Sequence, residues 1–185
     1  MANKVAVITD STACLTREHV EQYGIGIAPI PICFGDKVYR DWVDITPDEA
    51  YELFLQDPKS FKTAGASPGI FLEAYREASK QAKNILCITL SAKLSGANDA
   101  AKQAREEIKG ELPQLSIEVL DSQTVTAAEG FIALAAARAA EKGKSLAEVV
   151  QAAKEVRDKV TFLAFLDTIK PVSYTHLTLP TNREV

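Results

Sequence analysis

Residues 85–96 read Ile85-Leu86-Cys87-Ile88-Thr89-Leu90-Ser91-Ala92-Lys93-Leu94-Ser95-Gly96, and this stretch decides the expected fold. Its first six residues form a nearly continuous apolar run, which is typical of a central strand buried in a parallel sheet. The turn that follows carries hydroxyl groups, and a helix is expected from Gly96 to Glu107. A buried strand, a polar turn and a helix in this order predict one unit of an α/β fold.

The same alternation of strand and helix continues in both directions along the chain. Apolar runs predict strands at residues 5–8, 116–120 and 160–166, and an extended segment with two prolines covers residues 25–34. Helices are expected over residues 16–23, 46–55, 67–82 and 145–159, and in an Ala-rich segment that ends near residue 141. Residues 59–66 are expected to form a loop. The sequence therefore predicts an α/β protein with a mainly parallel sheet and helices on both faces.

The composition narrows the class of function. The chain has 185 residues, a net charge of -4 and a pI of about 5.3, so no basic face for nucleic acid is expected. No apolar run approaches the ~20 residues that span a bilayer, and no signal peptide is visible, which makes the cytoplasm the expected location. The three cysteines, Cys14, Cys33 and Cys87, are widely spaced, so we expect reduced, buried thiols and no metal site.

The last segment of the chain differs in amino-acid composition from the rest. Residues 171–185 are rich in threonine, and residues 172–181 can be encoded by a transposase adapter that is used in sequencing libraries. We therefore expect residues 171–185 to be a non-native tail. The break at Gly143 is expected to divide the remainder into an N-terminal α/β domain at residues 1–143 and the truncated start of a second, α+β domain at residues 144–170.

Polar turns follow three of the expected strands. These turns are Thr9-Asp10-Ser11-Thr12, Ser91-Ala92-Lys93-Leu94-Ser95-Gly96 and Asp121-Ser122-Gln123-Thr124. Ligands usually bind where the carboxyl ends of parallel strands meet, and the loop from Thr63 to Ser67 could reach the same edge. Hydroxyl groups and free N–H groups at helix starts suit a carboxylate or a phosphate without a fixed positive charge. The alternative is that these Ser and Thr residues only cap helices.

Other chemistries fit the residue pattern poorly. The sequence has no G-x-S-x-G turn for a Ser-His-Asp triad, no Cys or His cluster with metal spacing, and no glycine-rich nucleotide loop. Asp10 is a lone carboxylate at the end of the first strand. A phosphoryl-transfer or other small-molecule enzyme that uses Asp10 and the Ser/Thr turns is therefore the alternative function, although such an Asp more often caps a turn or orients a hydroxyl.

Five short motifs, in the same order, resemble those of the DegV family. They are Val7-Ile8-Thr9-Asp10-Ser11-Thr12-Ala13, Phe34-Gly35-Asp36-Lys37-Val38-Tyr39-Arg40-Asp41 with Val43-Asp44-Ile45-Thr46, Thr63-Ala64-Gly65-Ala66-Ser67-Pro68 with Gly69-Ile70-Phe71, Ser91-Ala92-Lys93-Leu94-Ser95-Gly96, and Asp121-Ser122-Gln123-Thr124-Val125. The resemblance runs from about Lys4 to Lys170, and the shared order makes it specific. Two departures stand out: Ala64-Gly65-Ala66 replaces the usual Ser-x-Pro, and Ala97 replaces a threonine.

The resemblance implies a two-domain lipid-binding protein that is not itself an enzyme. We expect it to be a monomer of the cytoplasm with no cofactor and no metal. Such a protein encloses one long-chain fatty acid and presents its carboxyl group to a separate ATP-dependent fatty-acid kinase, whose acyl phosphate product enters phospholipid synthesis. The residues that the resemblance places at the carboxylate are Thr63, Ser95, Ser91 and Ser67. The supporting turns are expected to use Asp10, Ser11, Gly96, Asp121 and Ser122.

Overall fold

The computed structural model describes residues 4–165, and its centre is a parallel four-stranded sheet. The strands are β1 (Val5–Asp10), β2 (Gly26–Ala28), β6 (Asn84–Thr89) and β7 (Ser116–Asp121), in the order β2-β1-β6-β7. The apolar run of the sequence lies in β6, which is buried because β1 and β7 pair with it on its two sides. The prediction of a parallel α/β fold is therefore confirmed.

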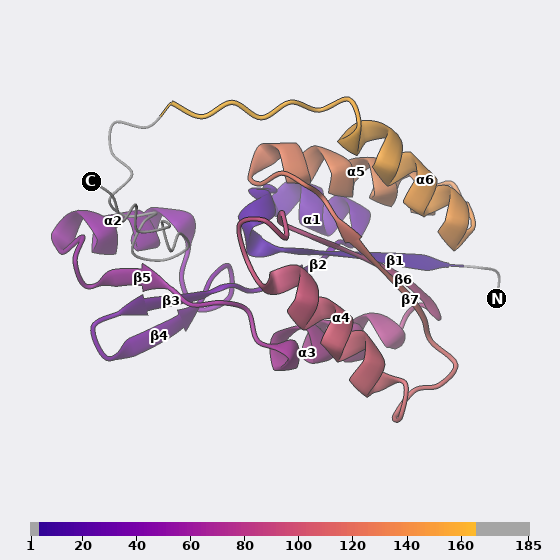
Figure 1. Cartoon of the computed structure of the whole chain (residues 1–185), viewed down its shortest axis with the longest axis horizontal. Helices are drawn as coiled ribbons and strands as arrows, with labels where there is room; N and C mark the ends of the chain where they lie inside the picture. The colour runs from indigo at the N-terminus through magenta and orange to yellow at the C-terminus, as the bar shows by residue number, and fades with distance from the viewer. Residues whose placement is uncertain (1–3, 166–185) are drawn as a thin grey trace, which may run out of the picture.

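Helices cover both faces of this sheet (Figure 1). One layer consists of α1 (Arg17–Tyr23), α5 (Ala127–Glu141) and α6 (Leu146–Arg157), and the other of α3 (Pro68–Ser79) and α4 (Ala97–Ile108). Because successive side chains of a strand point to opposite faces, Leu86 and Ile88 pack with the first layer, whereas Ile85 and Cys87 pack with the second. A short 3-10 turn, η1 (Ser11–Ala13), follows β1.

A second, antiparallel sheet lies beside the main one and was not predicted. Its strands are β3 (Pro31–Phe34), β4 (Lys37–Arg40) and β5 (Phe61–Thr63), in the order β4-β3-β5, with α2 (Pro47–Gln56) packed on them. The extended segment 25–34 is split at residues 29–30 between the two sheets. The prediction of a loop at residues 59–66 is wrong for β5, because short, partly exposed strands leave no long apolar run in the sequence.

Two helix starts are confirmed in detail. Thr46 and Glu49 form a reciprocal capping box at the start of α2, and Ser145 and Glu148 form another at the start of α6. In each box the hydroxyl oxygen accepts from one free N–H group, and the carboxylate accepts from another. The spacing of these residues in the sequence was therefore sufficient to locate both helices.

The strand predicted at residues 160–166 is wrong over its described part. Residues 160–165 form no regular structure, and Phe165 is 97% exposed. A strand needs a hydrogen-bonded neighbour, and none of the described strands pairs with this segment. Leu166 and the expected non-native tail lie outside the described residues. The division of the chain at Gly143 stays a prediction; α6, which follows it, packs on α5 and buries Val149 and Ala153.

The cysteines are less uniform than expected. Cys87 is buried in the sheet and Cys33 is partly buried, but Cys14 is exposed, so the prediction is wrong for this thiol. Cys14 follows the 3-10 turn and has a left-handed φ of 51°. Among the described residues, no helix is long and apolar enough to cross a bilayer, and no cluster of His, Cys, Asp or Glu is arranged to hold a metal ion.

Candidate functional site

The polar turns after β6 and β7 are held together by hydrogen bonds at the carboxyl edge of the main sheet. Asp121 Oδ1 accepts from the backbone N–H of Ala92 at 3.2 Å and of Gln123 at 2.8 Å. The Ser91 N–H donates to the Thr124 carbonyl at 2.8 Å. These bonds fix the two turns to one another, as expected for loops that leave neighbouring parallel strands at the same edge.

A cavity of about 580 Å³ lies at these two turns and at the end of α6. Part of its wall is apolar and part carries hydroxyl, amide and basic groups. The lining residues are Ser91, Lys93, Leu94, Ser122, Gln123, Thr124, Val125, Arg157, Val160, Thr161 and Phe162. Such a mixed wall suits an amphiphile with an anionic head group and an apolar body. The expected anion site had no fixed positive charge, whereas this cavity has two basic side chains.

Ser91 and Ser95 lie in the same turn, and both hydroxyl oxygens already accept local hydrogen bonds. Ser91 Oγ, which is buried, accepts from the Lys93 N–H at 3.3 Å. Ser95 Oγ, which is half-buried, accepts from the Ala97 N–H at 3.2 Å near the start of α4. Because a hydroxyl group can donate one hydrogen while it accepts others, a local cap and a ligand contact are compatible at both residues.

Thr63 and Ser67 lie on the segment that leaves the second sheet for α3. Thr63 ends β5 opposite Ile32, and Ser67 precedes α3, is exposed and makes no capping hydrogen bond. Neither residue lines the cavity, and Ser95 does not line it either, so Ser91 is the one residue of the predicted carboxylate set that borders it. Ala66, which lies between them, belongs to the same buried cluster as Leu90 and Ala97, the residues on either side of the Ser91–Ser95 turn. The two hydroxyl-bearing segments are therefore connected through shared packing.

The supporting residues act within the turns themselves. Ser11 Oγ accepts from the Ile30 N–H at 3.0 Å and so ties the end of β1 to the connection between the two sheets. Ser122 Oγ donates to the Thr124 carbonyl at 3.1 Å and accepts from the Thr124 N–H at 3.2 Å. Gly96 is the residue before α4 and has an ordinary negative φ, so its position does not require a glycine.

The loop between β7 and α5, which forms part of the cavity wall, has an uncommon backbone. Gln123 has a φ of 58°, and Thr126 has a φ of 60° with a ψ of -144°. A β-branched residue in this region costs about 1–3 kcal/mol, and such strain persists only where the surroundings impose it. Thr124 Oγ1 is buried there without a hydrogen-bond partner in the described part of the chain. The loop is thus held in a shape that leaves a hydroxyl group for another partner.

A buried pair of carboxyl groups lies next to this edge, between β1 and α5. Asp10 Oδ2 accepts from the Leu90 N–H at 2.8 Å, and Asp10 Oδ1 accepts from Thr12 Oγ1 at 2.5 Å. Glu129 Oε1 accepts from Thr9 Oγ1 at 3.0 Å, and Glu129 Oε2 lies 3.2 Å from Thr12 Oγ1. Since the Thr12 hydroxyl has one hydrogen, which goes to Asp10, the contact with Glu129 is satisfied when Glu129 is protonated and donates.

The pKa values of this pair agree with that arrangement. Burial raises the pKa of Asp10, and burial together with the negative charge of Asp10 raises the pKa of Glu129 well above its usual range. Asp10 is fully buried and both of its oxygens accept hydrogen bonds inside the protein. It therefore holds the turn in place and does not face the cavity.

Replacing Glu129 by glutamine should flatten the dependence of stability on pH. The pKa of Glu129 is raised on folding. Its contribution is therefore fully present below the unfolded value of about 4.3 and is lost as the pH rises through the raised folded value. Glutamine keeps an acceptor for Thr9 but cannot ionise. Urea denaturation between about pH 4 and pH 8 checks this: parallel profiles for the two proteins would contradict it.

Four residues that matter at this edge were not assigned a role from the sequence, although three of them had a usable signal. Glu129 is the one charged residue within an Ala-rich apolar helix start, a pattern that indicates a paired buried group. Lys93 lies inside the turn that the motif analysis identified. Thr124 likewise lies inside the polar turn from Asp121 to Thr124. Arg157 carried no such signal, because only the tertiary packing of α6 brings it to the cavity.

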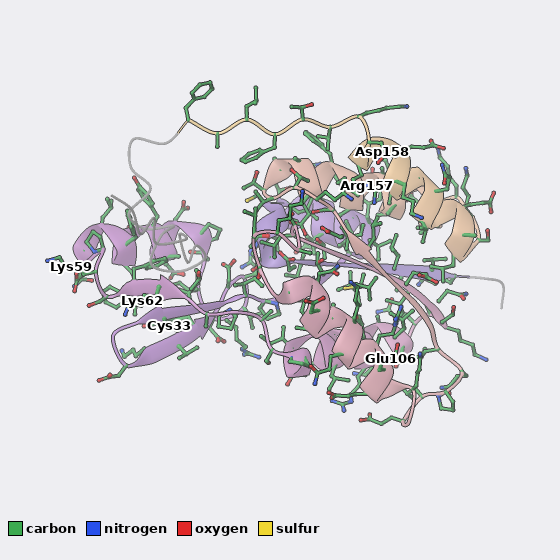
Figure 2. All side chains as sticks on the ribbon, in the orientation of Figure 1. Cys33, Lys59, Lys62, Glu106, Arg157 and Asp158 are labelled. Atoms are coloured by element: carbon green, nitrogen blue, oxygen red, sulfur yellow. The ribbon has the colours of Figure 1, made fainter. Side chains whose placement is uncertain are left out.

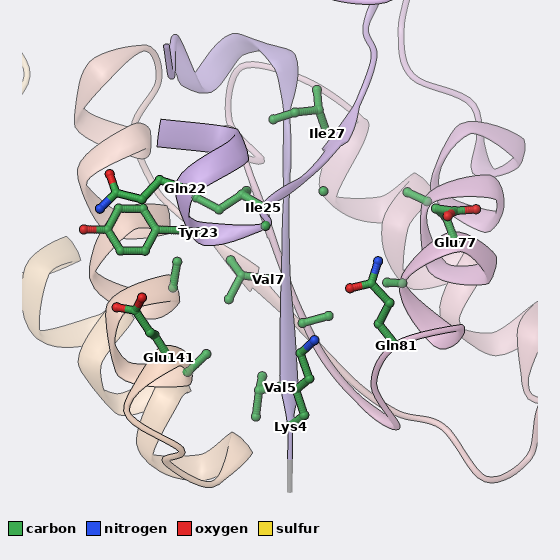
Figure 3. Close-up of a pocket in the computed structure, with 17 residues that line it drawn as sticks. Lys4, Val5, Val7, Gln22, Tyr23, Ile25, Ile27, Glu77, Gln81 and Glu141 are labelled. Carbon is green, nitrogen blue, oxygen red and sulfur yellow. The ribbon is translucent and has the colours of Figure 1, made fainter. Parts of the chain in front are cut away.

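A second cavity, of about 500 Å³, lies beside β1 at the other end of the sheet (Figure 3). β6 pairs with residues 5–9 of β1 on one side, but on the other side β2 pairs with residues 8–10. Among the described residues, the β2 side of β1 at residues 5–7 therefore has no strand beside it. In Figure 3 the side chains of Val5 and Val7 and the end of α1 at Tyr23 border this space. None of the residues predicted to bind a carboxylate lines it.

Comparison with known proteins gives a consistent pattern. A model of the family described as "Uncharacterised protein, DegV family" matches residues 4–172. A DegV domain-containing protein from Caldanaerobacter subterraneus subsp. tengcongensis is 32% identical over 166 residues, which are 90% of this chain and 58% of that protein. The chain thus spans little more than half the length of this relative.

Solved structures resemble the chain over a similar extent. A DegV family protein from Thermus thermophilus, described as fatty acid binding, has a TM-score of 0.72 at 30% identity, and the match covers 84% of this chain and 54% of that protein. DegV from Bacillus subtilis, described as a fatty acid binding protein, has a TM-score of 0.76 at 26% identity, with 85% and 55% covered.

Proposed function

The chain belongs to the DegV family, and on this basis we propose that it holds a long-chain fatty acid and presents the carboxyl group to a separate fatty-acid kinase. Thr63, Ser91, Ser95 and Ser67 are the proposed contacts of the carboxylate. Of these four, Ser91 lines the cavity described above, Ser95 lies in the same turn, and Thr63 and Ser67 lie on the segment that leads to α3. In this proposal the chain is a monomeric lipid-binding subunit of the cytoplasm and does not itself catalyse a reaction.

The cavity at the carboxyl edge of the sheet is the observation that carries the proposal. Its wall places the Ser91 and Ser122 hydroxyl groups next to apolar side chains such as Val125 and Phe162. A fatty acid has a carboxylate that hydroxyl groups can bind and an apolar chain that apolar side chains can cover. Each CH₂ group that it buries contributes about 0.8 kcal/mol to binding. The similar proteins from Thermus thermophilus and Bacillus subtilis, both described as fatty acid binding, support the same ligand.

The placement of Asp10 does not favour the alternative of a phosphoryl-transfer enzyme. A carboxylate that acts on a substrate or holds Mg²⁺ must face the ligand with at least one oxygen. Asp10 is 0% exposed, and its oxygens accept from Thr12 and Leu90. Its contacts are those of a residue that shapes a turn.

Ligand extraction and two alanine variants test the proposal. The chain is purified from bacteria and its bound lipid is measured by mass spectrometry, with the fatty acid affinity measured afterwards on delipidated protein. Thr63→Ala and Ser95→Ala should each weaken fatty acid binding by about tenfold, because each removes a hydrogen bond to a charged group worth about 1.5–3 kcal/mol.

Ser116→Ala is the matched control, because Ser116 starts β7 at the opposite end of the sheet and is exposed. This control should bind as the parent does. Absence of any acyl chain from the purified protein, together with no affinity for added fatty acid, would overturn the proposed function. The kinase partnership is tested separately, by adding ATP and a fatty-acid kinase to the lipid-loaded chain and measuring acyl phosphate.

A further inference from the structure

The cavity at the carboxyl edge is positively charged, although the chain as a whole is acidic. Lys93 and Arg157 line it, and none of its lining residues is acidic. The whole chain carries 21 basic and 25 acidic residues, with a net charge of -4. Lys93 and Arg157 therefore give this wall a positive charge that the chain as a whole lacks, and such a wall points to an anionic ligand. The acidic partner of Arg157, Asp158, lies outside the lining.

Two other cavities in residues 4–165 lack this feature. The one on α2 has three acidic and no basic lining residues: Asp44, Glu49 and Glu52. The one beside β1 has one basic and two acidic lining residues: Lys4, Glu77 and Glu141. Of these three cavities, the one at the hydroxyl-bearing turns is thus the one with an excess of basic lining residues.

The two basic groups reach the cavity from different elements. Lys93 is exposed and lies in the turn between Ser91 and Ser95. Arg157 is the last residue of α6, its side chain is only 19% exposed, and it donates from Nε and Nη2 to Oδ1 of Asp158 at 3.0 and 2.9 Å (Figure 2). Asp158 is 65% exposed to water. A guanidinium group has five N–H donors, so this pair leaves others for an anion.

We infer that Lys93 and Arg157 make the cavity selective for an ionised carboxylate over uncharged lipids of the same chain length. This inference rests on the proposed function and names its specificity. Hydroxyl groups such as that of Ser91 donate to an acid, an ester or an alcohol alike, and an apolar wall distinguishes only length and shape. Fixed positive charges attract the carboxylate alone, so they supply the discrimination that the hydroxyl groups lack.

Palmitate and cetyl alcohol, which share a chain length, are the probes for the test. Binding of each is measured at about pH 8, where a carboxylic acid is ionised. The parent should bind palmitate more tightly, and its palmitate affinity should fall as salt is added. The Lys93→Gln/Arg157→Gln variant should lose about tenfold in palmitate affinity and most of the salt dependence, and should keep its affinity for cetyl alcohol within about twofold.

The Lys102→Gln/Arg105→Gln variant is the matched control, since it removes one lysine and one arginine from α4 outside the cavity. It should bind both probes as the parent does. Retained binding of cetyl alcohol shows that the double variant is folded.

Three results would contradict the inference, and they are distinct from one another. Equal binding of the two probes by the parent would overturn the selectivity and leave the proposed function standing. Suppose instead that the Lys93→Gln/Arg157→Gln variant unfolds at the same temperature as the parent but loses affinity for both probes equally. This result would show that Lys93 and Arg157 shape the cavity and do not distinguish charged from uncharged ligands. Failure of the parent to bind either probe would overturn the proposed function and, with it, this inference.

Discussion

Replacing Asp10 by alanine should lower the free energy of unfolding by about 3 kcal/mol, because it leaves buried donors without acceptors. Asp10 accepts from the Leu90 N–H, the Thr12 N–H and the Thr12 hydroxyl. Removal of a buried carboxylate recovers some desolvation energy, since burial raises the pKa of Asp10. This gain is smaller than the cost of several unsatisfied donors at about 1–3 kcal/mol each.

Asp10→Asn provides the comparison for this effect. Asparagine keeps one acceptor oxygen, and its amide can donate to the neighbouring Glu129, so we expect a loss of only about 1 kcal/mol. Urea denaturation at neutral pH measures both variants. Equal losses for the two variants would show that charge, and not the number of hydrogen bonds, sets the role of Asp10.

Replacing Gly130 by alanine should lower the free energy of unfolding by about 2 kcal/mol. Gly130 lies in α5, and a Cβ atom added there would be 2.5 Å from the Ala13 carbonyl oxygen and 3.2 Å from Leu15 Cδ2. Overpacking typically costs about 1–3 kcal/mol, and a clash with a backbone atom is expected at the upper end of this range. The gain in helix propensity from Gly to Ala returns only about 1 kcal/mol. The result is a helix pushed away from η1.

Gly110→Ala is the control for this prediction, because its added Cβ would meet the nearest atom, the Glu107 carbonyl oxygen, at an ordinary 3.5 Å. We expect its effect to stay below about 1 kcal/mol. Thermal unfolding followed by circular dichroism compares the three proteins. A Gly130→Ala variant as stable as Gly110→Ala would show that η1 can move away without cost.

The main sheet was predictable from the sequence because its strands are buried on both faces. The run from Ile85 to Leu90 could only be accommodated in the middle of a sheet, and the capping residues Thr46 and Ser145 located two helices. The second sheet was not predictable in the same way. Phe61 to Thr63 form a strand only because β3 pairs with them, and tertiary pairing of this kind has no local signature.

The candidate site was predictable in its hydroxyl groups but not in its charges. Ser91 and Ser122 were identified from turns that end parallel strands, and the cavity includes both. Arg157 comes from a helix more than thirty residues further along the chain than Ser122, and nothing in its local sequence indicates a site. Glu129 is buried against Thr9 through a contact 120 residues apart. Long-range packing determines where Arg157 and Glu129 lie, and neither the hydrophobic periodicity nor the capping residues of the sequence predict such packing.

The division of the chain into two sheets also affects how a bound ligand would contact the protein. Residues 31–63, which contain the second sheet and α2, form one lobe. The chain connects this lobe to the main body, which is the parallel sheet with its helices, through residues 29–30 and 64–67. The lobe carries Thr63, whereas the body carries Ser95. Arg17 of α1 contacts Trp42 of the lobe: its guanidinium lies 5.2 Å from the ring centroid, and its Nη2 donates to the Trp42 carbonyl at 3.4 Å. The Asp41 N–H donates to the carbonyl of Ile30, in the connection between the two sheets. A head group that is held by the hydroxyls of both Thr63 and Ser95 would connect the lobe to the main body. A bound ligand would then stabilise the arrangement of these two parts of the chain, because a ligand that binds one arrangement alone stabilises that arrangement.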